Sequence, residues 1–252
     1  MGDRDEAAAL PHTPLALRVT DVHIEYELFA ERRSALRDRF VGRRADDRRV
    51  VRAVNGVSFD VYEGESVGML GSNGSGKSTL LAAIAGLLAP VSGEILVSAE
   101  PKLMGVGATL IPSASGNRNI RLGCLALGMS PDEIVDRFDE IAAFTELGDA
   151  LERPLRTFSS GMRARLHFAI ATAMTPRILL IDEALAVGDK DFKAKSAARI
   201  TDMLAHAGTL LLVSHSMAEL QSHCKRGIWI DKGIVRMDSP IDDVVAAYSA
   251  EG

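Results

Sequence analysis

The chain has 252 residues, 47% of them apolar and 25% charged, and its formal net charge is −5. This length supports one large α/β domain with its own core. The net negative charge argues against nucleic acid as a partner, because proteins that bind it usually present basic surfaces. No apolar stretch reaches the ~18 residues needed to cross a bilayer, so we expect no membrane span. Cys124 and Cys224 lie far apart without metal-binding spacing, and we expect reduced core thiols in a cytoplasmic protein.

The first residues predict a polar tail and then two strands. Residues 1–14 contain Pro11 and Pro14 and are expected to be disordered. Strands are expected over 17–26 and 51–62, separated by an arginine-rich insertion at about 31–49. The insertion holds eight arginines against four acidic residues: Arg32, Arg33, Arg37, Arg39, Arg43, Arg44, Arg48 and Arg49 against Glu31, Asp38, Asp46 and Asp47.

Two interpretations of the insertion stay open. It is either a solvated hairpin extension or a short amphipathic helix in which Leu36 and Phe40 lie one turn apart and Ser34 is placed to cap. A helix of this kind would lie near the headgroup layer of a membrane, where its arginines would meet phosphate groups.

Residues 71–79 read G-S-N-G-S-G-K-S-T, between an apolar strand at 67–70 and a helical run at 80–84. A flexible Gly/Ser linker would not be flanked in this way, so the pattern predicts a P-loop. Its backbone N–H groups and the following helix dipole would bind a triphosphate. The spacing assigns Lys77 to the β- and γ-phosphates and Ser78 to Mg²⁺. The expected nucleotide-binding residues of the loop are Gly71, Ser72, Asn73, Gly74, Ser75, Gly76, Lys77, Ser78 and Thr79.

After a strand expected at 93–98, residues from about 102 to 174 read mainly as helices. Ser130 is placed to cap a helix that opens at Pro131 and continues through 134–147, and a further helix is expected over 163–174.

A second anion site is predicted where the last of these helices opens. Small polar residues and a glycine precede it: Ser159, Ser160, Gly161 and Met162. Because the P-loop already serves the triphosphate of its own chain, this site is expected to serve the phosphate bound by another copy of the protein.

Residues 177–183 form an apolar run that ends in two carboxylates. The run suits a strand buried on both faces, and α/β sheets bind ligands at the carboxyl edge of such strands. Asp182 is expected to hold Mg²⁺ through water, and Glu183 is expected to polarise the attacking water as a general base.

Another buried strand is expected over 210–213, followed by His215. Alone, His215 would be interpreted as a structural histidine, but at the same sheet edge as Asp182 it is expected to sense the γ-phosphate. The chain then predicts a hairpin over 227–237 that turns at Asp231-Lys232-Gly233, and a helix over 241–248. Its apolar face would hold Ile241, Val244, Val245 and Tyr248.

These motifs resemble those of the nucleotide-binding subunits of ABC transporters, and the resemblance covers nearly the whole chain. Residues 71–79 look like Walker A, 178–183 like Walker B, and 159–162 like the signature motif. By this resemblance Asp189 is the D-loop aspartate, His215 the switch histidine, and Tyr26 the aromatic that stacks on adenine. The alternative for Tyr26 is a core tyrosine on an edge strand. The implied fold is a RecA-like sheet plus an antiparallel β subdomain with an inserted helical subdomain, and the implied assembly is a homodimer.

Departures from the common pattern indicate a branch of the family. Residues 104–112 contain no glutamine, and the signature reads Ser-Ser-Gly-Met. With the stretches 116–120 and 183–189, this resembles the polysaccharide-export branch, which moves lipid-linked O-antigens, teichoic acids or galactan across the inner membrane. That branch carries a helix near the position of the arginine-rich insertion, at the cytosolic entrance. The resemblance implies ATP and Mg²⁺ as ligands, an integral-membrane permease as partner, a lipid-linked glycan as substrate, and a peripheral location at the cytoplasmic face of the membrane.

Two other function classes fit the sequence less well. A soluble ABC ATPase acting on nucleic acid or ribosomes would normally show two cassettes, a long coiled coil or zinc-binding cysteines, and none is present. A non-hydrolysing scaffold would have no need of an intact set of Lys77, Asp182 and Glu183. The chain ends without the carbohydrate-binding module that some exporter ATPases carry, so we expect none.

Overall fold

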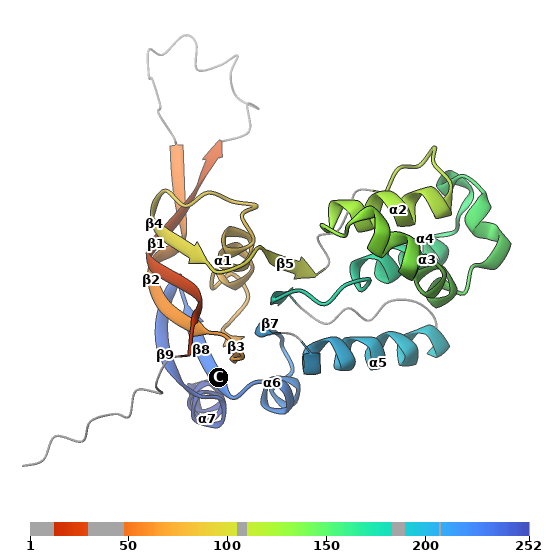
Figure 1. The fold of residues 1–252 in the computed structure, drawn as a ribbon. Coiled ribbons are helices and arrows are strands. Elements are labelled where there is room, and N and C mark those ends of the chain that lie inside the picture. Colours follow the sequence, from red (N-terminus) through yellow and green to blue (C-terminus); the bar gives the residue numbers. More distant parts are fainter. Residues whose placement is uncertain (1–12, 30–47, 105–109, 183–189, 207, 252) are drawn as a thin grey trace, which may run out of the picture.

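The computed structural model of the protein describes residues 13–29, 48–104, 110–182, 190–206 and 208–251. Two sheets and a helical portion make up this part of the chain (Figure 1). The smaller sheet has the strand order β2-β1-β4, and the larger one has the order β5-β6-β7-β3-β8-β9. The strands are β1 Leu15–Phe29, β2 Arg48–Tyr62, β3 Ser66–Leu70, β4 Ser92–Val97, β5 Pro101–Met104, β6 Ile178–Asp182, β7 Thr209–Val213, β8 Arg226–Asp231 and β9 Ile234–Pro240.

The larger sheet is parallel from β5 to β8, and β9 joins it antiparallel at one edge. Because side chains alternate along a strand, the apolar runs predicted from the sequence bury two faces at once. In β6, Leu180 packs in the core beneath the helix α1, Lys77–Ile84, whereas Leu179 and Ile181 pack on the opposite face. That opposite face is covered by the helices α6, Met217–His223, and α7, Ile241–Glu251.

Parallel pairing aligns the carboxyl ends of three neighbouring strands. Val213 of β7 lies opposite Met69 of β3 on one side and opposite Asp182 of β6 on the other. The residues that follow β3, β6 and β7 therefore leave the sheet at the same edge, which is where ligands of open α/β sheets bind.

The long antiparallel pair β1 and β2 extends the two strands predicted at this end of the chain. Residues 30–47, which hold most of the arginine-rich insertion, lie outside the described residues, as do residues 1–12 of the predicted tail. The insertion ends earlier than predicted, because Arg48 and Arg49 pair with β1 as the first residues of β2. Cross-strand pairing with Phe29 and Leu28 explains the difference, since pairing is not visible in the local sequence.

The helical portion contains α2 Gly116–Ala126, α3 Pro131–Thr145, α4 Ser160–Ala171 and two short 3₁₀ turns, Gly148–Glu152 and Leu155–Thr157. Ser130 caps α3 as predicted, and Glu133 completes a capping box with it. The predicted start of the helical portion and both predicted ends of α4 need correction. Residues 102–104 belong to strand β5 of the larger sheet, so the helical portion begins after Met104. α4 begins and ends three residues earlier than predicted, at Ser160 and Ala171, and Ser159 caps its start.

Both cysteines are buried, as predicted, and neither forms a disulfide. Cys124 packs in the core of the helical portion, and Cys224 packs beneath α7. Burial raises the pKa of Cys124 to about 11 and that of Cys224 to about 12, because the apolar surroundings disfavour the thiolate. Both thiols therefore remain protonated and unreactive near neutral pH.

The chain closes with a hairpin and α7. β8 and β9 are joined by Lys232 and Gly233, whose φ angles of 47° and 79° give a tight two-residue turn. Ile241 and Val244 of α7 are buried on β8, confirming the predicted apolar face, and the helix continues to Glu251. None of the helices within the described residues is long and apolar enough to span a bilayer.

Candidate functional site

The P-loop connects β3 to α1 at the carboxyl edge of the larger sheet. Gly71, Gly74 and Gly76 all have positive φ, and α1 begins at Lys77. A Cβ atom on Gly76 would lie 2.2 Å from the Ala53 carbonyl oxygen in β2. The antiparallel sheet thus approaches the loop so closely that a side chain cannot be accommodated at this position. The predicted role of these glycines in forming a tight backbone nest agrees with this geometry.

Lys77 crosses the P-loop with its ammonium group buried. Its Nζ atom donates to the carbonyl oxygens of Gly71 at 2.7 Å and Ser72 at 2.9 Å, and to the Ser75 hydroxyl at 3.3 Å. The residue is only 7% exposed. A buried ammonium is costly unless it is hydrogen-bonded, and these oxygens stabilise it inside the loop. The side chain therefore places a positive charge at the centre of the predicted phosphate site.

Tyr26 of β1 lies beside the first turn of α1. Its hydroxyl donates to the Thr79 hydroxyl over 3.4 Å, and the side chain is 41% exposed. This exposure argues against a core tyrosine, the alternative interpretation of the residue. The neighbouring Ser78, in the first turn of α1, is also exposed. The structure therefore brings Tyr26, Ser78 and the P-loop together.

Asp182 and His215 lie at the same edge. Asp182 is the last residue of β6 and is half-buried, whereas His215 follows β7 by two residues and is exposed. Since β7 lies between β6 and β3, these two residues leave the sheet next to the P-loop. Glu183 and Asp189 fall outside the described residues.

Three residues that sequence analysis missed hold the segment around His215. Ser214 donates to the Glu219 carboxylate at 2.5 Å and accepts from the Ser216 N–H at 3.0 Å. Ser216 in turn caps α6 by accepting from the Glu219 N–H. The spacing of Ser216 and Glu219 is a helix-capping pattern, so this signal was present in the sequence.

The predicted second anion site lies on the helical portion. The Ser159 hydroxyl accepts from the Met162 N–H at 3.2 Å and caps α4, and Ser160 and Gly161 are exposed. In Figure 1 the helical portion stands to one side of the sheets, apart from α1 and β3. The structure therefore does not bring the signature residues to the P-loop of the same chain.

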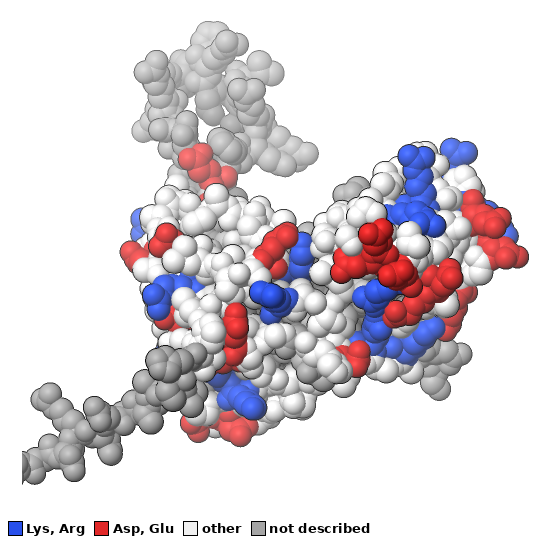
Figure 2. All heavy atoms as spheres, viewed as in Figure 1, with Lys and Arg blue, Asp and Glu red and all other residues white. Residues whose placement is uncertain are grey.

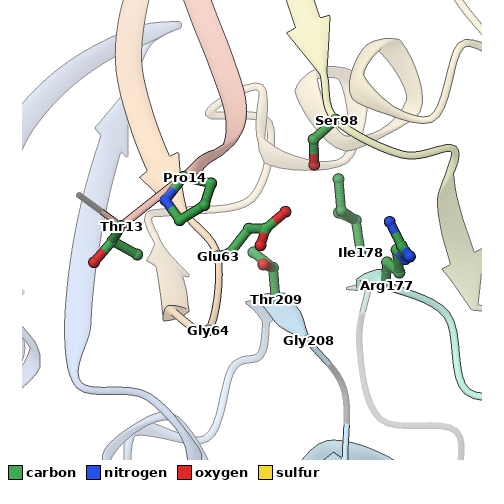
Figure 3. Close-up of a pocket in the computed structure, with 9 residues that line it drawn as sticks. All are labelled: Thr13, Pro14, Glu63, Gly64, Ser98, Arg177, Ile178, Gly208 and Thr209. Carbon is green, nitrogen blue, oxygen red and sulfur yellow. The ribbon is translucent and has the colours of Figure 1, made fainter.

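A cavity of 580 Å³ lies at the opposite edge of the larger sheet (Figure 3). Ile178 and Thr209, the first residues of β6 and β7, line it with Glu63, Arg177 and Ser98. The P-loop, Asp182 and His215 all follow the other ends of their strands, so none of these site residues reaches the cavity. Its place at the amino ends of the strands separates it from the predicted nucleotide site.

Charge is mixed over the helical portion. On the face that Figure 2 shows, Lys and Arg side chains alternate with Asp and Glu side chains rather than forming a broad basic area. Several are paired across helices, as Arg165 is with Glu146 at 3.0 Å. This face lacks the basic character that nucleic-acid binding selects.

A family model for ABC transporters matches residues 54–186. The chain belongs to the ABC transporter family. This match covers the P-loop and Asp182 as well as the helical portion between them. The predicted family and the predicted fold are both confirmed.

Relatives of the chain carry export names. It is 42% identical over 207 residues to the O-antigen export system ATP-binding protein RfbB of Myxococcus xanthus, covering 82% of this chain and 47% of that protein. It is 36% identical over 234 residues to the teichoic acids export ATP-binding protein TagH of Listeria monocytogenes, covering 92% of this chain and 70% of that protein. The chain thus spans roughly half to two thirds of the length of these two relatives.

Solved structures share the fold. The structure of an ATP-binding subunit of an ABC transporter superposes with a TM-score of 0.67 at 23% identity, covering 94% of this chain and 95% of that one. A dimeric ATP-binding cassette bound to ADP and Pi superposes with a TM-score of 0.64 at 21% identity, covering 89% of this chain and 98% of that one. At these identities the likeness concerns the fold alone.

Proposed function

We propose that the chain binds and hydrolyses ATP as the motor subunit of a transporter that exports a lipid-linked polysaccharide across the cytoplasmic membrane. A separate integral-membrane subunit would supply the pathway, and the chain would lie at the cytoplasmic face of the membrane. The observation that carries the ATPase function is the convergence of the P-loop, Asp182 and His215 at one edge of three neighbouring strands. The export names of the relatives support the substrate class.

Each residue of this edge has a proposed role in binding. The P-loop amides and Lys77 bind the β- and γ-phosphates, and Tyr26 stacks on the adenine. Ser78 and Asp182 offer a hydroxyl and a carboxylate at the same edge, and oxygen donors of this type fit Mg²⁺. Bound Mg²⁺ would offset the charge of the terminal phosphates.

Two residues have proposed roles in the chemical step. Glu183, which follows Asp182 directly, takes the proton of the attacking water as a general base. His215 contacts the γ-phosphate, and the bonds of Ser214 to Glu219 and Ser216 hold its backbone in position. These hydrogen bonds support the role of His215 as a γ-phosphate sensor, because its side chain can report on the phosphate only if its backbone is held in place.

The complete site requires a second copy. The P-loop and the exposed amino end of α4 lie on different parts of one chain, so we infer that Ser159, Ser160, Gly161 and Met162 bind the nucleotide held by the partner subunit. Asp189 would contact the same interface. Two copies would close head to tail around two ATP molecules.

The test is purification of the tagged chain from membranes of its native cells, followed by identification of the co-purifying integral protein and lipid-linked glycan. We expect a permease and a lipid-linked polysaccharide, with ATPase activity that the permease alters. A Lys77→Ala chain is the control, since it should still co-purify with the permease but lack ATPase activity. Recovery of ribosomal or nucleic-acid partners in place of a permease would overturn the export function and leave the ATPase assignment standing.

A further inference from the structure

The turn between β8 and β9 touches the P-loop. The Gly233 N–H donates to the Ser75 carbonyl at 2.9 Å, and the Gly233 carbonyl accepts from the Asn55 N–H at 2.8 Å. Gly233 is buried although it occupies the tip of a hairpin. The turn is thus hydrogen-bonded between the P-loop and strand β2, and it belongs to neither the Walker motifs nor the other predicted site residues.

A second contact joins the same hairpin to the start of the loop. A Cβ atom on Gly71 would lie 2.1 Å from the carbonyl oxygen of Ile230 in β8. Ile230 and Gly233 therefore bracket the P-loop, one beside its first residue and the other beside Ser75. The hairpin thus contacts the loop at Gly71 and at Ser75.

The bond from Gly233 fixes the orientation of one peptide group. In a trans peptide the carbonyl and the following N–H point in opposite directions, and this chain has no cis peptide within its described residues. Since the Ser75 carbonyl points to the hairpin, the Gly76 N–H points away from it. Among the described residues none accepts a hydrogen bond from the Gly76 N–H, although Gly76 is buried. Backbone donors of this kind at the start of a helix are suited to binding a phosphate oxygen.

Sterics restrict position 233 to glycine. Its φ of 79° disfavours residues with a side chain, and a Cβ atom would lie 2.8 Å from the Ala53 carbonyl oxygen. That carbonyl also lies against Gly76. Any displacement of the turn is therefore passed to the P-loop through Ser75 and through Ala53.

We propose that Gly233 is a positioning residue of the nucleotide site, which turns the Ser75–Gly76 peptide so that the Gly76 N–H faces a phosphate oxygen. This inference rests on the proposed ATPase function. It adds the β8–β9 turn to the residues that shape the phosphate site, although Gly233 lies 158 positions after Ser75 in the sequence. Binding of a phosphate and formation of the Gly233–Ser75 bond would favour each other, because each fixes the same peptide plane.

The test compares steady-state ATPase kinetics of the full chain carrying Gly233→Ala with those of Gly128→Ala. Gly128 also has positive φ, 94°, but a Cβ there would meet nothing within 4 Å, so it matches the backbone strain without touching the P-loop. We expect KM for ATP to rise about tenfold or more in Gly233→Ala, the effect of one lost hydrogen bond to a charged group. Because that bond acts in the ground state and the transition state alike, kcat should stay within about twofold.

The control variant Gly128→Ala should keep the wild-type KM and kcat. A Gly233→Ala variant with unchanged KM, or with lower kcat at unchanged KM, would overturn the proposal, since partial unfolding lowers the active fraction without changing KM. A wild-type chain that does not bind ATP would instead refute the proposed function itself.

Hydrogen exchange of the wild-type chain provides a measurement that does not depend on a variant folding. With saturating MgATP, the exchange rate of the Gly233 amide should fall to about one tenth or less of its rate without nucleotide. Ligand binding stabilises the hydrogen bonds that it requires. The Gly128 amide should exchange at the same rate with and without nucleotide. Equal exchange of the Gly233 amide in both conditions would refute the coupling.

Discussion

The ring of Phe192, in α5 (Lys190–His206), packs edge-on against the ring of Phe168 in α4, with ring centroids 5.9 Å apart and planes at 80°. Phe144 of α3 completes the cluster, with its ring centroid 5.7 Å from that of Phe192 and 5.9 Å from that of Phe168. Arg165 lies over the Phe192 ring and Lys195 over the Phe144 ring. Helix α5 is thereby attached to the helical portion by aromatic packing from three separate helices.

Replacing Phe192 by Ala should lower the free energy of unfolding by about 3–5 kcal/mol, because the side chain is fully buried and leaves a cavity between α4 and α5. Phe192→Leu, which fills most of that space, should cost clearly less. Urea denaturation followed by circular dichroism measures both. An equal loss of unfolding free energy in the two variants would mean that filling the space between α4 and α5 does not determine stability here.

Glu183→Gln should retain ATP binding while turnover falls by about 10²- to 10⁴-fold, because it removes the proposed general base and leaves the phosphate cradle intact. The variant should also accumulate as a closed dimer with ATP in size-exclusion chromatography with light scattering. Glu63→Gln, at the opposite edge of the sheet, is the matched control and should hydrolyse ATP normally. Wild-type turnover in Glu183→Gln would assign the base elsewhere.

Lys77→Ala should weaken ATP binding, because the variant loses the buried ammonium that the P-loop oxygens hold. Lys102→Ala is the control, since Lys102 of β5 pairs with Glu100 at 2.7 Å and β6 and β7 separate β5 from β3. Isothermal titration calorimetry with MgATP measures the difference. Equal affinity of the two variants would contradict the proposed phosphate site.

The arginine-rich insertion has a test in cells. Replacing Arg37, Arg39, Arg43 and Arg44 by Ser removes charge but keeps Leu36 and Phe40, and each arginine near an anionic surface is worth about 1 kcal/mol. We expect ATP turnover by the isolated chain to stay near wild type while glycan export falls. Normal export would favour the solvated hairpin, and loss of ATPase activity would show that the segment supports the fold.

Stability should decline in acid through Asp60. Arg18 donates to its carboxylate at 2.8 and 2.6 Å, and this hydrogen bonding lowers the pKa of Asp60. Because the pKa is lower in the folded state, the Asp60 carboxylate stabilises the fold at pH values above its unfolded-state pKa of about 3.9. This stabilisation is lost as pH falls through the folded-state pKa. Asp60→Asn should therefore melt below wild type at pH 7, and the gap should close below about pH 4. Asp139→Asn, on the exposed face of α3, is the control.

Features set by neighbouring residues could be predicted from the sequence. The P-loop, the Ser130 cap and the strand that ends at Asp182 depend on residues within a few positions of each other. Features set by distant pairing could not. Residues 102–104 read as the start of a helical portion, but β6 pairs with them as strand β5, and the Gly233–Ser75 bond joins segments that no local pattern connects.

The order of these contacts along the chain bears on how the protein is made. The helical portion has its own core within residues 110–174, so it can form early during synthesis. Strand β3 can join the sheet only after β7 and β8 have been synthesised, since Val67 pairs with Leu211 and with Arg226. The bond from Gly233 comes later still. A nascent chain stalled before Gly233 is therefore expected to hold a folded helical portion and no competent phosphate site, and ATP binding would report completion of the whole fold.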